Sequence, residues 1–219
     1  MKQTISLYLI ITHLVIGVCC SVCMADGVPP KVAEFATREF GAVDNHTTIW
    51  DSTKTFPLIE GISFFSTRSS LNVAPGNRKT IVFMYEHAAE RVVGLGVEGK
   101  DQKELINLVS RIKKPKIDSQ DWLRSFCRLI SASNGSCDDT VVTDFEIGKI
   151  HVEVANATDR GALARPQISD NTAKERSLVY YTMSGNSELW KWSVRFSATK
   201  GEISLAGIDR AYFGQYLPK

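Results

Sequence analysis

The amino-acid sequence predicts an α+β domain in which one mainly antiparallel sheet of about five to seven strands carries an N-terminal helix and a central helix pair. Two adjacent segments in the middle of the chain have apolar residues at helical spacing. Segments with period-two alternation, joined by turn-forming dipeptides, fill the last third of the chain. Because no crossover helices separate these strands, we do not expect a parallel nucleotide-binding sheet.

The helices are expected in three segments that each have an apolar stripe along one face. These segments are 31–41, 101–114 and 118–132, and either Asp118 or Ser119 is the expected N-cap of the third. The stripes consist of Val32, Phe35, Ala36 and Phe40; of Leu105, Leu108, Val109 and Ile112; and of Trp122, Phe126, Leu129 and Ile130. Each stripe is interpreted as core rather than as a ligand site.

The strands are expected in a series of hairpins. In the first half of the chain they lie at 58–66 and at 80–97, where the polar turn 87–90 divides a hairpin. In the second half they are expected at 141–147 and 150–155 across Gly148-Lys149, at 177–184 and 189–198 across Gly185-Asn186, and at 202–208. The tail, 209–219, is interpreted as a short helix that docks its aromatic side chains.

The strand at 189–198 has one aromatic face. Trp190 and Trp192 alternate with Lys191, and Val194 and Phe196 continue the same face. Such a face forms either core or a stacking platform for a sugar or a partner protein. Core is the interpretation we prefer for an amphipathic strand, and Trp190 and Trp192 are the candidate binding face if the surface is exposed.

The N-terminal 25 residues have the pattern of a secretory signal peptide. Lys2 precedes an apolar run from Ile5 to Val18, and small residues follow it. The run is shorter than the ~20 residues that a membrane-spanning helix needs. We therefore expect cleavage after Ala25, leaving 26–219 as a single exported domain without a membrane span. Its compartment would be the periplasm in a Gram-negative host and the extracellular space otherwise.

Three cysteines lie in the signal region, at Cys19, Cys20 and Cys23. Lipidation of one of them is a disfavoured alternative, because no small side chain directly precedes any of the three. A zinc knuckle at Cys20 and Cys23 is also disfavoured, since no second ligand pair follows. We expect neither a metal nor any other cofactor.

Two cysteines lie beyond the signal region, at Cys127 and Cys137, and Ser-Asn-Gly-Ser separates them as a turn. In an oxidising compartment this pair predicts a structural disulfide worth about 2 to 3 kcal/mol on the chain-entropy model. A catalytic redox pair would instead have the C-x-x-C spacing. The sequons at Asn45, Asn134 and Asn156 would carry glycans only in a eukaryotic host.

The charge of the chain is nearly balanced, at +2 over 219 residues. Nucleic-acid binding is therefore not expected, since it usually requires a concentrated basic face. The one basic cluster is 111–116, at the predicted end of the 101–114 helix. There its cations would complement the helix dipole.

A glycine pattern at Gly94, Gly96 and Gly99 fits G-x-G-x-x-G between a predicted strand and a predicted helix. It lacks the second parallel strand of a dinucleotide fold, and Asp101 stands where a phosphate loop needs a hydroxyl. We interpret these glycines as close packing and a turn. Whether this turn binds a ligand stays open.

The remaining chemical candidates are weak patterns. His87 and Glu90 could clamp a cation if they lay on a helix, but the second histidine of a zinc helix is missing. Asp144 and Glu146, on one face of the expected strand, could act as an acid–base pair only if the fold placed them in a cleft. A solvated surface is the preferred interpretation of both pairs.

Two functions follow as hypotheses. The first is a non-catalytic exported protein that binds another envelope or secreted protein, as an inhibitor, an immunity-type protein or an accessory protein. Its binding elements would be the Trp190 strand or the polar loops at 67–79 and 156–176. The alternative is a cell-envelope hydrolase that uses an unrecognised carboxylate or histidine site. A binder should present an apolar patch, and a hydrolase should present a cleft with paired titratable groups.

Overall fold

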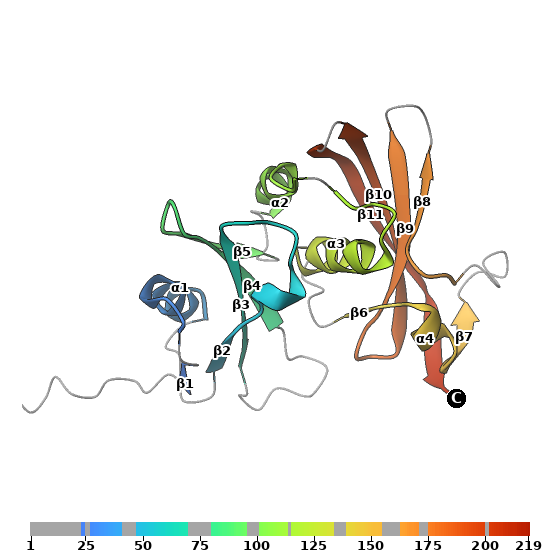
Figure 1. The fold of residues 1–219 in the computed structure, drawn as a ribbon. Coiled ribbons are helices and arrows are strands. Elements are labelled where there is room, and N and C mark those ends of the chain that lie inside the picture. Colours follow the sequence, from blue (N-terminus) through green and yellow to red (C-terminus); the bar gives the residue numbers. More distant parts are fainter. Residues whose placement is uncertain are drawn as a thin grey trace, which may run out of the picture.

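The computed structural model describes residues 23–24, 27–40, 47–69, 80–95, 101–113, 115–133, 139–154, 163–170, 175–199 and 202–219. Within these residues the chain forms two mainly antiparallel sheets with helices between and beside them (Figure 1). The mixed α and β composition and the antiparallel pairing agree with the sequence-based prediction. The expectation of one sheet is wrong, because the strands of the first half of the chain and those of the second half form two separate sheets.

The first sheet has the order β1-β2-β3-β4-β5. Its strands are β1 (Cys23–Met24), β2 (Thr47–Asp51), β3 (Ile62–Ser69), β4 (Thr80–Glu86) and β5 (Arg91–Leu95), with the short 3-10 helix η1 (Thr53–Thr55) after β2. β1 pairs parallel to β2, and the other neighbours pair antiparallel. The predicted hairpin around residues 87–90 is confirmed as β4 and β5.

The second sheet has the order β6-β9-β10-β11-β7, and β8 pairs with β9 outside this path. Its strands are β6 (Thr140–Val141), β7 (Ile150–Val154), β8 (Gln167–Asp170), β9 (Arg176–Met183), β10 (Glu188–Thr199) and β11 (Glu202–Pro218). The predicted β9–β10 and β10–β11 hairpins are both present. Among the described strands, none of this sheet pairs with a strand of the first sheet.

The helix α1 (Pro30–Phe40) lies on one face of the first sheet. Its Val32 and Ala36 are fully buried in a small cluster with Ile49, Phe65 and Phe83 of β2, β3 and β4. The edge of the Phe35 ring packs against Phe83 at 5.3 Å between centroids. This cluster covers the face of the first sheet opposite to the helix pair.

The helices α2 (Asp101–Ser110) and α3 (Gln120–Ser133) lie between the two sheets (Figure 1). Their apolar stripes enter the largest hydrophobic cluster, which also contains Phe64 of β3, Met84 of β4 and Val194 of β10. The stripe of α2 is fully buried, as is that of α3 apart from the half-buried Trp122. The helical spacing read from the sequence is thus confirmed for both helices.

The tail at 209–219 is a strand, contrary to the helix expected from the sequence. It forms the second half of β11, where residues from Ile208 to Gln215 pair with β10 and Gly214 to Pro218 pair with β7. Aromatic residues are good strand formers, and pairing on both edges satisfies the backbone. The tail's aromatic residues therefore dock from a strand rather than from a helix.

The segment 141–147 is also different from the prediction. It forms the two-residue strand β6 followed by the one-turn helix α4 (Asp144–Ile147). The N–H of Thr143 donates to a Glu146 carboxylate oxygen at 2.8 Å, and this contact favours a helix start over an extended chain. The hairpin expected across Gly148-Lys149 is absent, because β7 pairs with β11 instead.

Two further expectations concern the membrane and the signal region. Among the described helices, none is long and apolar enough to span a membrane. Residues 1–22 lie outside the described residues, and Cys23 and Met24 form β1. Cleavage after Ala25 stays a prediction.

Candidate binding groove

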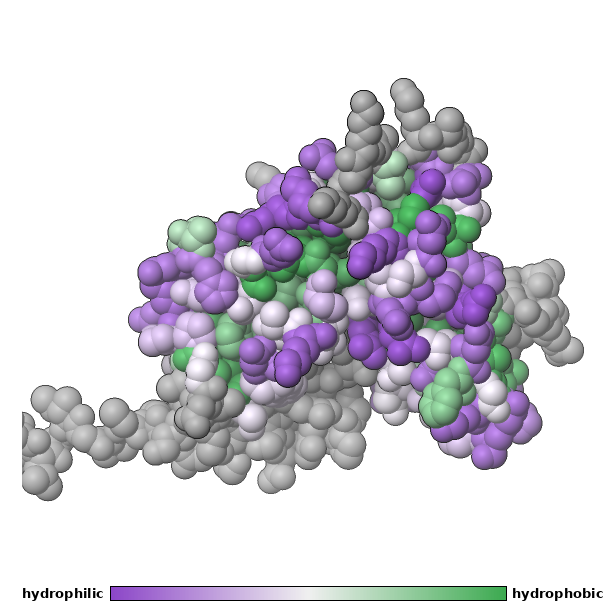
Figure 2. Space-filling view, viewed as in Figure 1, coloured by the Kyte–Doolittle hydropathy of each residue, from purple (hydrophilic) through white to green (hydrophobic). Residues whose placement is uncertain are grey.

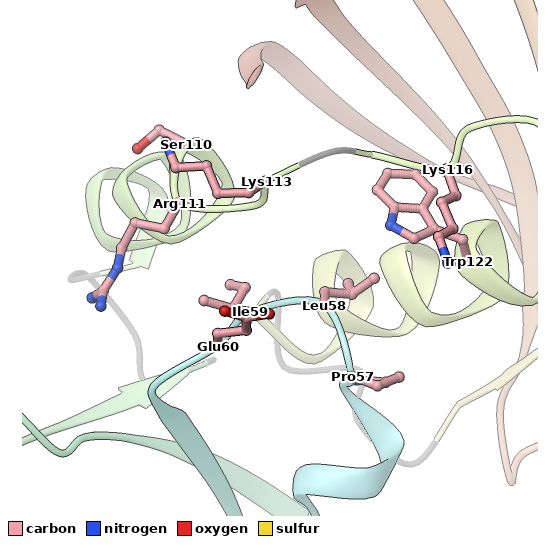
Figure 3. A pocket seen from close by; sticks show the side chains of 9 residues that line it. All are labelled: Pro57, Leu58, Ile59, Glu60, Ser110, Arg111, Lys113, Lys116 and Trp122. Atoms are coloured by element: carbon pink, nitrogen blue, oxygen red, sulfur yellow. The ribbon is translucent and has the colours of Figure 1, made fainter. Parts of the chain in front are cut away.

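A groove of about 690 Å³ lies where a turn, the end of one helix and the start of another meet (Figure 3). The turn precedes β3, and the helix ends belong to α2 and α3. The groove is lined by Pro57, Leu58, Ile59, Glu60, Ser110, Arg111, Lys113, Lys116 and Trp122. On the face drawn in Figure 2, hydrophobic surface in this region is bordered by hydrophilic side chains.

The turn supplies the apolar floor of the groove. Phe56, Leu58 and Ile59 belong to the main hydrophobic cluster, and Leu58 and Ile59 each keep 9% of their surface exposed. Gly61 then reverses the chain with φ +73°, a conformation that L side chains rarely adopt. The floor is consequently held by the core beneath it.

Trp122 forms the aromatic wall. Its backbone N–H donates to the Ser119 hydroxyl at 3.4 Å, which makes Ser119 the N-cap of α3. The indole ring is half-buried and stacks on Phe126, with 5.1 Å between centroids and 18° between planes. None of the described residues accepts a hydrogen bond from the indole N–H.

The basic side chains come from the segment that leaves α2. Backbone bonds from Arg111 to Leu108 and from Ile112 to Val109 tighten the last turn of the helix. The Arg111 guanidinium extends away from Trp122 and pairs with Glu86 of β4 at 2.8 Å. Arg111 is therefore part of the scaffold.

The two lysines of the groove are less engaged. The ammonium of Lys113 lies 3.4 Å from the Glu202 carboxylate, and about seven-tenths of each side chain is exposed. Lys116 is exposed and makes no ion pair with any described residue. Glu60 is the only carboxylate among the lining residues and is also unpaired within the described structure. The groove consequently offers donors and positive charge over an apolar floor.

Trp192, one half of the candidate binding face, is core. It is fully buried, and its ring stacks on Tyr180 with 5.7 Å between centroids and 5° between planes. Its indole N–H donates to the Thr182 hydroxyl at 3.0 Å. The assignment of Trp192 to a binding face is therefore wrong, and the preferred core interpretation holds for it.

Trp190 is half-buried and already covered by other side chains. The Arg210 guanidinium lies 4.0 Å from the centre of its ring, and the ring meets Tyr212 edge-on at 5.6 Å. Arg210 also contacts the Asp139 carboxylate at 3.6 Å. Burial lowers the pKa of Arg210, and Asp139 opposes that shift. The Trp190 ring is therefore already covered by Arg210 and Tyr212 of the same chain.

The disulfide expected between Cys127 and Cys137 is not seen. Cys127 is a free thiol on the buried side of α3, and burial raises its pKa well above the ordinary value. Cys137 lies outside the described residues. The pairing therefore stays a prediction, and it would require Cys137 to enter the main core.

The candidates for acid–base chemistry lie in structural contacts. Glu146 accepts both hydrogen bonds that Thr143 donates, from its N–H and its hydroxyl, and Asp144 pairs with Arg165 at 3.0 Å. Both lie on α4, so the shared strand face expected for them does not exist. Burial raises the pKa of Glu146, but the hydrogen bonds from Thr143 outweigh this and lower it overall.

The histidine and glycine candidates also form no common site among the described residues. His87 lies on the exposed β4–β5 turn, 2.7 Å from the Ser63 hydroxyl, and Glu90 pairs with Lys31 at 2.6 Å. Among the described residues no group of three metal-ligating side chains converges. Gly94 lies in β5, whereas Gly96 and Gly99 are outside the described residues.

No protein-family model, no curated protein and no solved structure matches this chain. The groove is therefore described from its own residues. The basic cluster 111–116 and the stripe that contains Trp122 are both visible in the sequence, but their position against the turn 57–60 is not. The signal present in the sequence is an aromatic residue, Trp122, six positions after the end of the basic segment 111–116.

Proposed function

We propose that this chain is an exported, non-catalytic protein that binds another envelope or secreted protein through the groove between α2, α3 and the turn before β3. The observation that carries the proposal is the half-buried Trp122, which has no acceptor for its indole N–H in the described structure and lines the same groove as the exposed Lys113 and Lys116. The signal pattern of residues 1–25 supports export.

The composition of the groove is typical of protein recognition. Tryptophan is enriched among residues whose truncation costs most binding energy, particularly where an apolar pocket excludes water. Leu58 and Ile59 supply such a floor, and the stacking of Trp122 on Phe126 holds the ring in place before binding. A preorganised anchor loses little conformational entropy on association.

The hydrolase alternative has less support from the geometry. Asp144, Glu146 and His87 each take part in a local contact that accounts for its position. Asp144 and His87 are exposed and Glu146 is half-buried, and the described contacts of the three do not join any two of them into an acid–base pair. Binding is consequently the function that we put forward.

The proposal is tested by capture and reconstitution. The full-length chain with a C-terminal affinity tag is expressed in its host, and stoichiometric partners from envelope and culture fractions are identified by mass spectrometry. A purified partner should then bind the tagged protein saturably, and Trp122→Ala should weaken this binding about tenfold or more.

Trp50→Ala is the matched control, because Trp50 is another half-buried tryptophan and does not line the groove. Circular dichroism establishes that both variants are folded. A search that yields no saturable partner would refute the binding function. Equal losses for the two variants would refute the assignment of the groove.

A further inference from the structure

We infer that the groove takes an acidic segment of the partner protein, with a bulky apolar side chain against Trp122 and carboxylates at Lys113 and Lys116. This inference rests on the proposed function and specifies the chemistry of the partner. The groove has three basic side chains and one carboxylate among its lining residues. Complementary charge is how interfaces select partners and raise association rates.

The two lysines are free to change partners at low cost. The Lys113–Glu202 pair is largely exposed on both sides, and exposed ion pairs contribute little to stability. A carboxylate of an incoming segment can therefore replace Glu202 at little cost. Lys116 has no described ion pair to give up. The cost of desolvating Arg111 does not arise, because Arg111 stays with Glu86.

The apolar floor indicates more than a simple anion. Inorganic phosphate would use the lysines and leave the exposed part of the half-buried Trp122 ring in contact with water, whereas Leu58 and Ile59 are already about nine-tenths buried. A segment that contains an aromatic or large aliphatic residue covers the exposed part of Trp122 and gains hydrophobic free energy. The ligand should therefore combine negative charge with an apolar side chain.

The hydrogen-bonding groups of the groove distinguish a peptide from a polyphosphate. Trp122 offers an indole N–H, and Glu60 offers a carboxylate that has no partner among the described residues. A peptide backbone supplies both the carbonyl that the indole needs and the N–H that the carboxylate needs. A polyphosphate or a DNA backbone supplies only acceptors and has no donor for Glu60.

The experiment is a fluorescence anisotropy titration with labelled, capped peptides. The probe is Asp-Glu-Phe-Asp-Glu, compared with the neutral Asn-Gln-Phe-Asn-Gln and with the non-aromatic Asp-Glu-Ala-Asp-Glu. Each is titrated with wild-type protein, with Lys116→Glu and with Lys191→Glu. Lys191 lies on the central strand β10 and does not line the groove, so this control changes the net charge equally.

We expect the acidic phenylalanine peptide to bind the wild type and Lys191→Glu with the same affinity. Lys116→Glu should weaken binding about tenfold or more, since an attraction becomes a repulsion at contact distance. Both comparison peptides should bind more weakly, and added salt should weaken the acidic probe. Equal binding of the neutral peptide, or no effect of Lys116→Glu, would overturn the inference.

A competition experiment tests whether the groove prefers another anion to the acidic peptide. Displacement of the acidic peptide by inorganic pyrophosphate or by phosphatidylglycerol vesicles at lower concentrations than unlabelled peptide would also overturn the inference. The two proposals fail separately. A captured partner that binds wild type and Lys116→Glu equally would sustain the function and refute the acidic segment. Peptide binding as expected without any saturable protein partner would sustain the chemistry of the groove and refute the function.

Discussion

The buried hydroxyl of Thr182 in β9 links two polar groups of the second sheet. It accepts a hydrogen bond from the Trp192 indole at 3.0 Å and donates one to the Asp139 carboxylate at 3.1 Å. Thr182 is fully buried. The substitution Thr182→Val keeps the shape of the side chain and removes both bonds.

The expected loss of stability follows from the two groups that lose a partner, the Trp192 indole N–H and the Asp139 carboxylate. A buried donor without a partner costs about 1 to 3 kcal/mol, and a hydrogen bond to a charged group contributes about 1.5 to 3 kcal/mol. Asp139 keeps its contact with Arg210, so the two values should not add fully. We expect Thr182→Val to lower the free energy of unfolding by about 2 to 4 kcal/mol.

The matched control is Thr67→Val in β3. Thr67 is also fully buried, but its hydroxyl has no hydrogen-bond partner within the described residues. Its replacement should be neutral or stabilise by about 1 kcal/mol. Both variants are measured by urea unfolding, with the slope of the transition checked against the wild type. Equal losses for the two variants, or a Thr182→Val protein as stable as the wild type, would refute the reasoning.

Three further predictions use different properties. Cys127 is expected to resist iodoacetamide in the native protein, because the thiol is buried and its pKa is raised. After denaturation it should react, unless a disulfide to Cys137 has formed. Rapid labelling of the native protein would contradict the burial of Cys127. Glu146→Gln should destabilise by about 1 kcal/mol at neutral pH, measured by urea unfolding. Because the folded-state pKa of Glu146 is lowered, the wild type should lose this advantage as the pH falls below 4.5, and a difference that persists in acid would contradict the cause. Gly61→Ala should cost about 1 to 2 kcal/mol through its positive φ, whereas Gly185→Ala, with open space around its Cβ, should change the unfolding midpoint little.

The helix pair and the β4–β5 hairpin could be predicted from the sequence because their signals are local. The stripe of α2 runs over about two turns, and the stripe of α3 begins after a capping serine. The hairpin has apolar strands on either side of a polar four-residue turn. In these cases each residue's preference agrees with the final packing.

The misassigned elements depend on partners that are distant in sequence. The end of β11 is a strand because β10 and β7 pair with it on either side, and neither contact is visible in the tail itself. The division into two sheets depends on which strands fail to meet, a property that no single strand encodes. Tertiary pairing often overrides weak local propensity in this way.

The groove could not be predicted from the sequence for the same reason. Lys116 and Trp122 are close in sequence, but the floor at Leu58 and Ile59 comes from a turn in the first half of the chain. The sequence shows that each of these residues is basic, aromatic or apolar. Only the packing of the turn against α2 and α3 places them around one cavity.

The position of α2 and α3 between the two sheets has a consequence for unfolding. The largest hydrophobic cluster contains side chains from both sheets and from both helices. If either sheet came apart, the helices would expose an apolar face that the other sheet could not cover. The two sheets should therefore melt together as one cooperative unit, with far-ultraviolet circular dichroism and tryptophan fluorescence reporting the same midpoint.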